Sequence, residues 1–86
     1  MIKQEKLNMG GINRRYFVEY FECQGGVTLD GENFIGDGWK VRISPETFRD
    51  NEILKLPRVE ITLLGEEALL VRFIENLRKN FLRGGG

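Results

Sequence analysis

The chain of 86 residues contains no histidine and a single cysteine. The absence of histidine excludes Ser-His-Asp and Cys-His catalysis, and it excludes every metal site that needs an imidazole. The single cysteine, Cys23, excludes an intramolecular disulfide. Because Cys23 follows Glu22 near the end of a predicted helix, neither a helix N-terminus nor a basic neighbour favours its thiolate, and we expect an ordinary packed thiol.

The chain also lacks a surplus of charge and a long apolar run. Its 13 basic and 13 acidic residues cancel, whereas a domain dedicated to nucleic acid needs a basic surplus to neutralise phosphates. No apolar run approaches membrane-spanning length, and the first residues, MIKQEKLNMG, contain no apolar core of a secretion signal. We therefore expect a cytoplasmic protein that binds neither nucleic acid nor a membrane.

Apolar residues are present in the amount that one small domain needs. They make up 41% of the chain, and the aromatic residues include six Phe, two Tyr and one Trp, which is enough for a compact core. No repeat, low-complexity stretch or linker interrupts the sequence. We predict a single domain over residues 1–86, in which residues 84–86 form a flexible glycine tail.

Two stretches have the apolar periodicity of a helix, and the first covers residues 13–24. Asn13 is a candidate N-cap, and Gly25 and Gly26 provide the stop. Its apolar side chains recur at the spacing of one helical face: Tyr16, Phe17, Tyr20 and Phe21.

The second predicted helix ends the chain, and Gly65 is expected to turn the backbone into it. Its apolar side chains keep a spacing of three and four: Leu70, Phe73, Ile74, Leu77 and Phe81. Its charges suit the helix dipole, because acidic residues stand at its start and basic residues at its end: Glu66, Glu67, Arg78, Lys79 and Arg83.

Alternating apolar residues predict the strands. A short edge strand is expected at residues 2–9, and four consecutive strands are expected around Val27 and Leu29 and at 33–35, 39–44 and 58–63. Residues 45–52 are interpreted as a polar loop whose Phe48 returns to the core, and Pro57 marks the entrance of the last strand.

The predicted order is therefore β-α-β-β-β-β-α. Four consecutive strands of alternating polarity leave one sheet face in water, so both amphipathic helices must cover the other face. The fold class that follows is α+β: a two-layer sandwich of an antiparallel sheet with two helices on one face.

Several residue clusters could suggest binding sites, but each has a simpler interpretation. The stretch DGENFIGDG (30–38) lacks the oxygen ligands of a calcium loop at the required positions, and two hairpin turns explain it better. Trp39 with Arg42, or Tyr16 and Tyr20 with Arg15, could stack on bases, but core packing is favoured. We therefore predict no catalytic, metal or cofactor site.

The chain ends in Arg83, Gly84, Gly85 and Gly86. Terminal glycines are often simply frayed. A C-terminal carboxylate that is activated as an acyl-adenylate must, however, pass through a narrow channel, and residues without side chains pass most easily. Sulfur carriers and ubiquitin-like modifiers end in Gly-Gly for this reason, so both interpretations of the tail stay open.

The stretch LPRVEITLLGEEALLVRFIENLRKNFLRGGG (56–86) resembles the C-terminal domain of proteins related to MoaD, the small subunit of molybdopterin synthase. The resemblance covers about residues 12–86. It implies a fold like that of the TATA-box-binding protein, β-α-β(4)-α. The β-grasp half of those proteins has no counterpart in this chain, and in a β-grasp domain a strand rather than a helix leads into the glycine tail.

Two functional hypotheses follow. The first is a non-catalytic accessory or carrier protein in sulfur transfer or molybdenum cofactor biosynthesis. Gly86 would be the acceptor, Gly84 and Gly85 the threading segment and Arg83 a docking contact for an adenylating (E1-like) enzyme. The alternative is an interaction module that binds a protein or small ligand on its open sheet face, or forms a homodimer, with a functionally irrelevant tail.

Overall fold

The computed structural model describes residues 1–48 and 56–81, and within them the predicted order of elements is confirmed. Two helices and five strands follow one another in the chain: β1 (Ile2–Gly10), α1 (Arg14–Cys23), β2 (Val27–Thr28), β3 (Asn33–Gly36), β4 (Trp39–Ile43), β5 (Arg58–Glu66) and α2 (Glu67–Phe81). Pro57 stands immediately before β5, where its missing N–H costs no bond within the strand.

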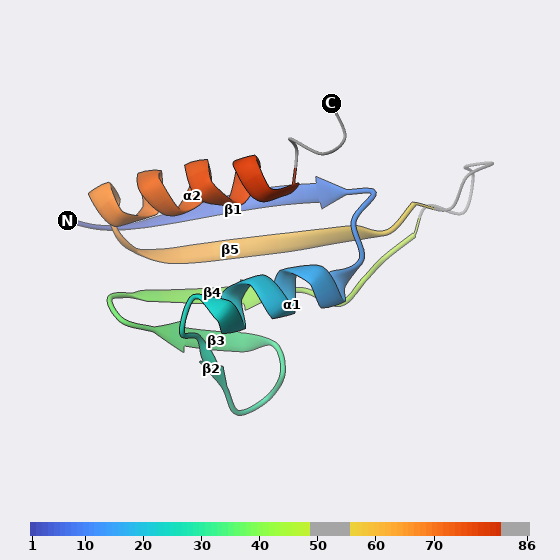
Figure 1. Ribbon diagram of the computed structural model, residues 1–86, viewed down its shortest axis with the longest axis horizontal. Coiled ribbons are helices and arrows are strands. Elements are labelled where there is room, and N and C mark those ends of the chain that lie inside the picture. The colour runs from blue at the N-terminus through green and yellow to red at the C-terminus, as the bar shows by residue number, and fades with distance from the viewer. Residues whose placement is uncertain (49–55, 82–86) are drawn as a thin grey trace.

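The five strands form one antiparallel sheet in the order β1-β5-β4-β3-β2 (Figure 1). Strands β2 to β5 are joined in sequence to their spatial neighbours, whereas β1 pairs with β5, from the far end of the chain. The predicted strand at 2–9 is therefore confirmed as an edge strand, and β5 lies in the interior of the sheet.

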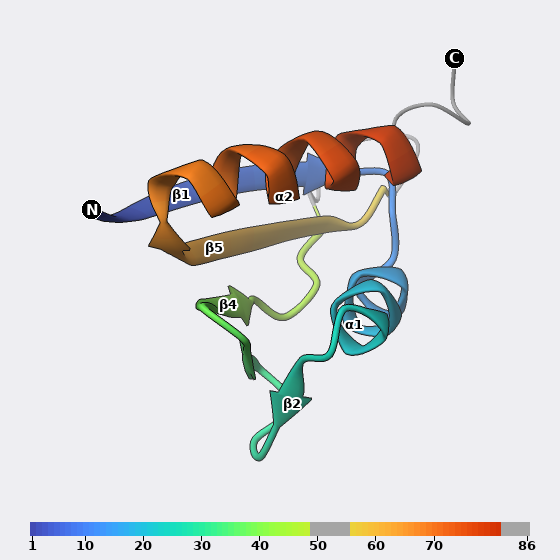
Figure 2. The same cartoon turned by 60° about the vertical axis from the view of Figure 1, so that its left-hand side comes forward.

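Both helices cover the same face of the sheet. Helix α2 runs alongside β1 and β5, and α1 lies beside β4 (Figures 1 and 2). One apolar core joins the helices to that face, and its buried members are Phe17, Phe21, Phe34, Trp39, Val41, Ile43, Val59, Ile61, Leu63, Leu70, Phe73 and Leu77. The predicted two-layer α+β sandwich is confirmed.

The alternation of the sequence decides which face is covered. Trp39, Val41 and Ile43 of β4 are buried, and the residues between them, Lys40 and Arg42, are exposed. Strand β5 has the same period, so apolar rows run across the paired strands on the helix side. The opposite side, which we call the open face, carries mainly polar side chains.

We expected Gly65 to turn the chain into the last helix, but it does not. It lies within β5, opposite Trp39 on one side and Lys3 on the other, and α2 begins directly after Glu66. A Cβ at position 65 would stand 2.8 Å from the carbonyl oxygen of Gly38. Glycine is needed here because neighbouring backbone approaches closely, and Glu66 stays in the strand instead of starting the helix.

The N-terminus of α1 is capped by a residue distant in sequence. Asn13 precedes the helix, but its side chain makes no capping hydrogen bond. The backbone N–H of Arg14 instead donates to the Glu46 carboxylate, 32 residues away, and the Asn13 side-chain amide donates to the same oxygen at 3.3 Å. A carboxylate at this end also complements the helix dipole.

Three apolar expectations were wrong, two of them because the side chains lie off the buried stripe of α1. Cys23 is exposed, since it is two residues, about 200° around the helix, from the buried Phe21. Tyr16 is partly exposed for a similar reason, and the α1 stripe is carried by Phe17 and Phe21. Phe48, expected to return to the core, is half-exposed.

The segments around β2 also differ from the prediction. Strand β2 has only two residues, and Leu29, expected within a strand, is fully exposed. In the predicted loop 45–52, Thr47 pairs with Arg58 through two backbone hydrogen bonds of 2.8 and 2.9 Å. Residues 49–52 of that loop lie outside the described residues.

The close approach at Gly65 predicts a measurable sensitivity. We expect Gly65→Ala to lower the free energy of unfolding by about 1–3 kcal/mol, because the new methyl group must displace the Gly38 backbone. Gly10→Ala is the matched control, because nothing lies within 4 Å of a Cβ built there, and it should change stability by less than about 0.5 kcal/mol. Urea denaturation followed by circular dichroism measures both, and equal effects would contradict this account of Gly65.

Candidate functional site

The residues of the predicted tail, Arg83 to Gly86, lie outside the described residues. The end of α2, which precedes the tail and which we call its root, is described. Phe81, the last residue of α2, packs between two rings of α1. Its ring centroid lies 4.7 Å from that of Phe17 and 5.6 Å from that of Tyr20. This contact fixes the end of α2 against α1, so Phe81, the last described residue, lies in the helix layer.

Charged side chains stand in the last turn of α2, and aromatic side chains of α1 pack against its end. Arg78 and Lys79 are exposed in the last turn of α2, where they complement the helix dipole, as predicted. On α1, the Arg15 guanidinium donates to the Tyr16 hydroxyl at 3.0 Å and lies 4.9 Å from the centre of its ring. This hydrogen bond raises the pKa of Arg15, and burial against the aromatic cluster raises the pKa of Tyr20.

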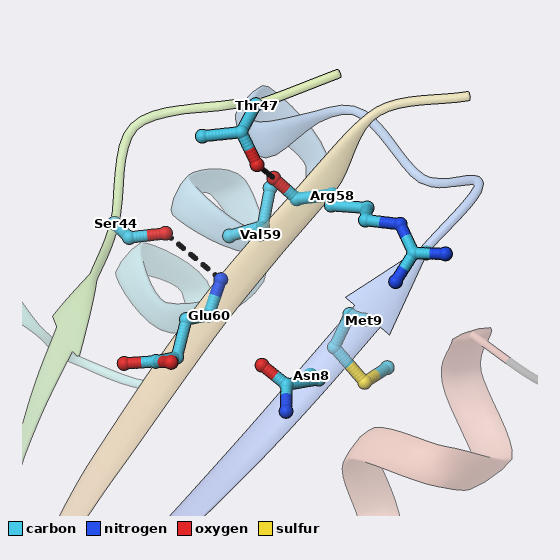
Figure 3. A pocket seen from close by; sticks show the side chains of 8 residues that line it. Asn8, Met9, Ser44, Thr47, Arg58, Val59 and Glu60 are labelled. Atoms are coloured by element: carbon cyan, nitrogen blue, oxygen red, sulfur yellow. Dashed lines mark hydrogen bonds between the residues drawn. The ribbon is translucent and has the colours of Figure 1, made fainter. Parts of the chain in front are cut away.

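A second candidate region is a shallow hollow of about 330 Å³ across the ends of β1, β5 and the segment after β4 (Figure 3). Asn8 and Met9 of β1, Ser44, Thr47 and the β5 residues Arg58, Val59 and Glu60 line it, together with Gly10. The Ser44 hydroxyl accepts the backbone N–H of Glu60 at 2.8 Å, and the Thr47 hydroxyl donates to the Arg58 carbonyl at 3.4 Å. These hydroxyls therefore help to hold the segment after β4 against β5.

The open face carries more basic than acidic side chains. The register places Lys40, Arg42 and Lys6 on this face, and Glu60 lies among them. Arg42 also forms an ion pair with Glu32, with 3.5 Å between nitrogen and oxygen. A neighbouring hollow along this face shares Ser44 and Glu60 with the first, so the two form a continuous polar surface.

Comparison with known protein families shows to which family the chain belongs. The model of the archaeal MoaD-like protein family matches residues 5–86, which is nearly the whole sequence. The chain belongs to this family. A search among curated proteins found no significant match. The resemblance to MoaD-related proteins inferred from the sequence is thereby confirmed, and the match includes the glycine tail.

The glycine-rich segment of the MoaD-like domain forms turns, as predicted. The side-chain amide of Asn33 donates to one Asp30 oxygen at 2.8 Å, and the backbone N–H groups of Asn33 and Glu32 donate to the other at 2.7 and 2.8 Å. These hydrogen bonds, led by that of the Asn33 side chain, hold the pKa of Asp30 well below its usual range. Its carboxylate is thus committed to the turn, and the described residues contain no cluster of three or more metal-ligating side chains.

The aromatic residues of the domain do not form a stacking platform on the open face. Trp39 is 6% exposed and packs against Phe21 and Phe73 on the helix side, with ring centroids 5.8 and 4.9 Å away. Core packing, the favoured interpretation of Trp39, is therefore confirmed. In the part of the chain that is described, no helix is long and apolar enough to span a membrane.

The packing of Phe81 predicts its contribution to stability. Phe81→Ala should lower the free energy of unfolding by about 1–2 kcal/mol, less than a fully buried Phe would, because the side chain is half-buried at a helix end. Phe48→Ala removes the same atoms from a half-exposed position and should change stability by less than about 0.5 kcal/mol. Urea titrations of the two variants compare them, and a neutral Phe81→Ala would show that the end of α2 is not anchored.

Proposed function

We propose that this MoaD-like protein is a non-catalytic carrier or accessory protein in sulfur transfer, of the kind that serves molybdenum cofactor biosynthesis. The observation that carries the proposal is the family match, which extends to Gly86 and so takes in the Gly-Gly terminus. In this proposal the chain supplies only a carboxylate, and a partner enzyme supplies the catalysis.

The chemistry requires an adenylating enzyme, ATP and a source of sulfide. The Gly86 carboxylate attacks the α-phosphorus of ATP, the bond to pyrophosphate breaks, and an acyl-adenylate forms. Hydrosulfide then attacks the acyl carbon, AMP leaves and a proton is released, so the terminus becomes a thiocarboxylate. No electron is transferred in either step.

The geometry of the root supports such a role. Five residues follow Phe81, and an extended chain spans at most about 3.6 Å per residue, so the terminal carboxylate can reach roughly 18 Å from the domain. Within that reach Gly84 and Gly85 can enter a narrow channel, because they carry no side chain. An enzyme that holds the tail would also meet the last turn of α2, which presents the exposed Arg78 and Lys79.

The proposal is tested by incubating the protein with an adenylating enzyme that activates MoaD-type carriers, Mg-ATP and sulfide, followed by intact-mass measurement. We expect a mass gain equal to the exchange of one oxygen for sulfur, located at Gly86 by fragmentation. A variant that lacks Gly85 and Gly86 should gain nothing, because its carboxylate no longer reaches the nucleotide. Arg83→Ala should react more slowly if Arg83 is a docking contact.

An unchanged terminus in the full chain would contradict the carrier role. Equal conversion of the full and the shortened chains would contradict the role of the threading glycines. The Gly65→Ala variant, at a temperature where it remains native, is a control with a change in the domain and an intact tail, so it should be converted like the full chain.

The second candidate function is that of an interaction module that uses the open face. The observation that favours it is the continuous polar surface through Ser44 and Glu60, bordered by Lys6 and Arg42. Deletion of Gly85 and Gly86 would leave such an interaction intact, whereas Arg42→Glu would weaken it. The two candidates are thus separated by which variant loses the partner in a pull-down with the full chain as reference.

A further inference from the structure

The two edges of the sheet differ in a way that bears on association. Strand β2 is an edge of only two residues, which is too short to template another strand. Strand β1 is an edge of nine residues, and its pairing with β5 runs through nine consecutive positions without a bulge. Among the described residues no other strand pairs with β1, so its outer edge presents a long, regular row of backbone groups.

The direction of those backbone groups follows from the bonds at the two ends of β1. The Gly11 N–H donates to the Pro57 carbonyl at 2.9 Å, and the Glu67 N–H donates to the Met1 carbonyl at 3.1 Å. Odd-numbered residues therefore form the hydrogen-bonded pairs with β5, because these pairs alternate along an antiparallel ladder. The N–H and C=O groups of Ile2, Gln4, Lys6 and Asn8 consequently point away from β5.

We propose that two copies of this chain form a symmetric dimer by antiparallel pairing of β1 with β1, centred on Gln4. A two-fold axis normal to the sheet keeps the helix layers on one side. Such pairing requires the even-numbered residues, whose backbone groups point away from β5, to hydrogen-bond to even-numbered residues of the second copy. In this register Gln4 lies opposite Gln4 of the second copy, Ile2 lies opposite Lys6, and about six backbone hydrogen bonds form.

The side chains of β1 are complementary in this register. Met1, Lys3, Glu5 and Leu7 face the helix side of the sheet in both copies, and the two strands run in opposite directions. Lys3 of one copy therefore lies opposite Glu5 of the other, and Met1 lies opposite Leu7, so that each pair occurs twice. The charged pairs fall at positions without backbone bonds, where side chains approach most closely. Displaced by one step in either direction, the axis places Lys3 opposite Lys3 or Glu5 opposite Glu5, which like charge disfavours. Displaced by two steps, it places Lys6 opposite Lys6 in one direction, and in the other it leaves only residues 1–3 paired.

Exposed apolar side chains gather at the same edge. Met1, directly before β1, is 90% exposed, and Ile2 is 65% exposed. On α2, Glu67 reaches the Lys3 ammonium at 3.4 Å, and Val71, one turn further along the same flank, is 53% exposed. Lysines often protect a free edge from pairing. In this register, however, Lys3 meets a carboxylate and Lys6 covers Ile2 with its methylene stem.

Cysteine cross-linking tests the register. In a Cys23→Ser background, Gln4→Cys should form a disulfide-linked dimer on mild oxidation, because Cα atoms of a hydrogen-bonded pair lie about 5.5 Å apart. Lys6→Cys is the matched control on the same face. Its two copies would be about 13 Å apart along the strands, so it should stay monomeric on a non-reducing gel. Cross-linking of Lys6→Cys in place of Gln4→Cys would overturn the register.

Charge exchange tests the complementarity without a covalent bond. In sedimentation equilibrium, Lys3→Glu and Glu5→Lys should each raise the dimer dissociation constant by about tenfold or more, because two attractive pairs become repulsive. The double variant should restore the wild-type constant, although it cannot restore the contact between Lys3 and Glu67. Failure of the double variant to recover, or a wild-type chain that stays monomeric at millimolar concentration, would overturn the proposal.

Proline scanning of the outer edge provides a third measurement. Gln4→Pro and Asn8→Pro both remove an N–H that points away from β5, so both should leave the fold intact by circular dichroism. Only Gln4→Pro should abolish the dimer, since Asn8 lies beyond the paired segment. Equal loss of association in both variants would overturn the inference.

Discussion

The antiparallel pairing of β1 with β5 joins the first strand of the chain to the last, and the arrangement of both layers depends on it. Nine consecutive pairs fix β1 beside β5, and β5 in turn pairs with β4, so the last strand becomes an interior strand. Because α2 starts at Glu67 without an intervening loop, the direction of β5 also sets where the helix lies. The hydrogen bond from the Glu67 N–H to the Met1 carbonyl and the ion pair from Lys3 to Glu67 attach the first turn of α2 to β1.

The corner around Trp39 shows how closely the two layers are fitted. The indole lies against Phe21 of α1 and Phe73 of α2, and these two rings stack on each other at an interplanar angle of 13°. A Cβ at Gly36 would fall 2.0 Å from the indole, and one at Gly65 would meet the backbone beside it. The indole is therefore accommodated by Gly36 on the neighbouring strand β3, the Trp39 backbone by Gly65 on β5, and one residue couples α1, α2 and the sheet.

Much of this architecture could be predicted from the sequence because its signals are local. Apolar side chains that are buried recur with the period of the element that carries them. Examples are the alternation at Trp39, Val41 and Ile43 and the helical spacing of Leu70, Phe73 and Leu77. The role of Gly65 could not be predicted, since a glycine that breaks a helix and one that admits a neighbouring carbonyl look the same in sequence. The capping of α1 by Glu46 was equally hidden, because its partner stands 32 residues away.

The candidate sites divide in the same way. The turn around Asp30 was predictable, since Asp, Asn and Gly at these offsets favour local hydrogen bonds, and its carboxylate is satisfied within three residues. The contact of Phe81 with Phe17 and Tyr20 was not, because periodicity gives the buried face of a helix but not the partner across the interface. The hollow at Ser44 and Glu60 depends on strand register, which the sequence alone leaves open.

The proposed tail chemistry and the proposed dimer use opposite ends of α2. The dimer is centred on Gln4, next to Lys3, whose ammonium contacts Glu67 in the first turn of the helix. Phe81, the last residue before the tail, ends the helix, and a helix of 15 residues is about 22 Å long, so its two ends lie roughly that far apart. Pairing of β1 with a second copy would therefore leave both tail roots uncovered, and an enzyme could engage each carboxylate without displacing the other copy. A carrier built on this fold can for that reason be dimeric and still present two independent C-termini.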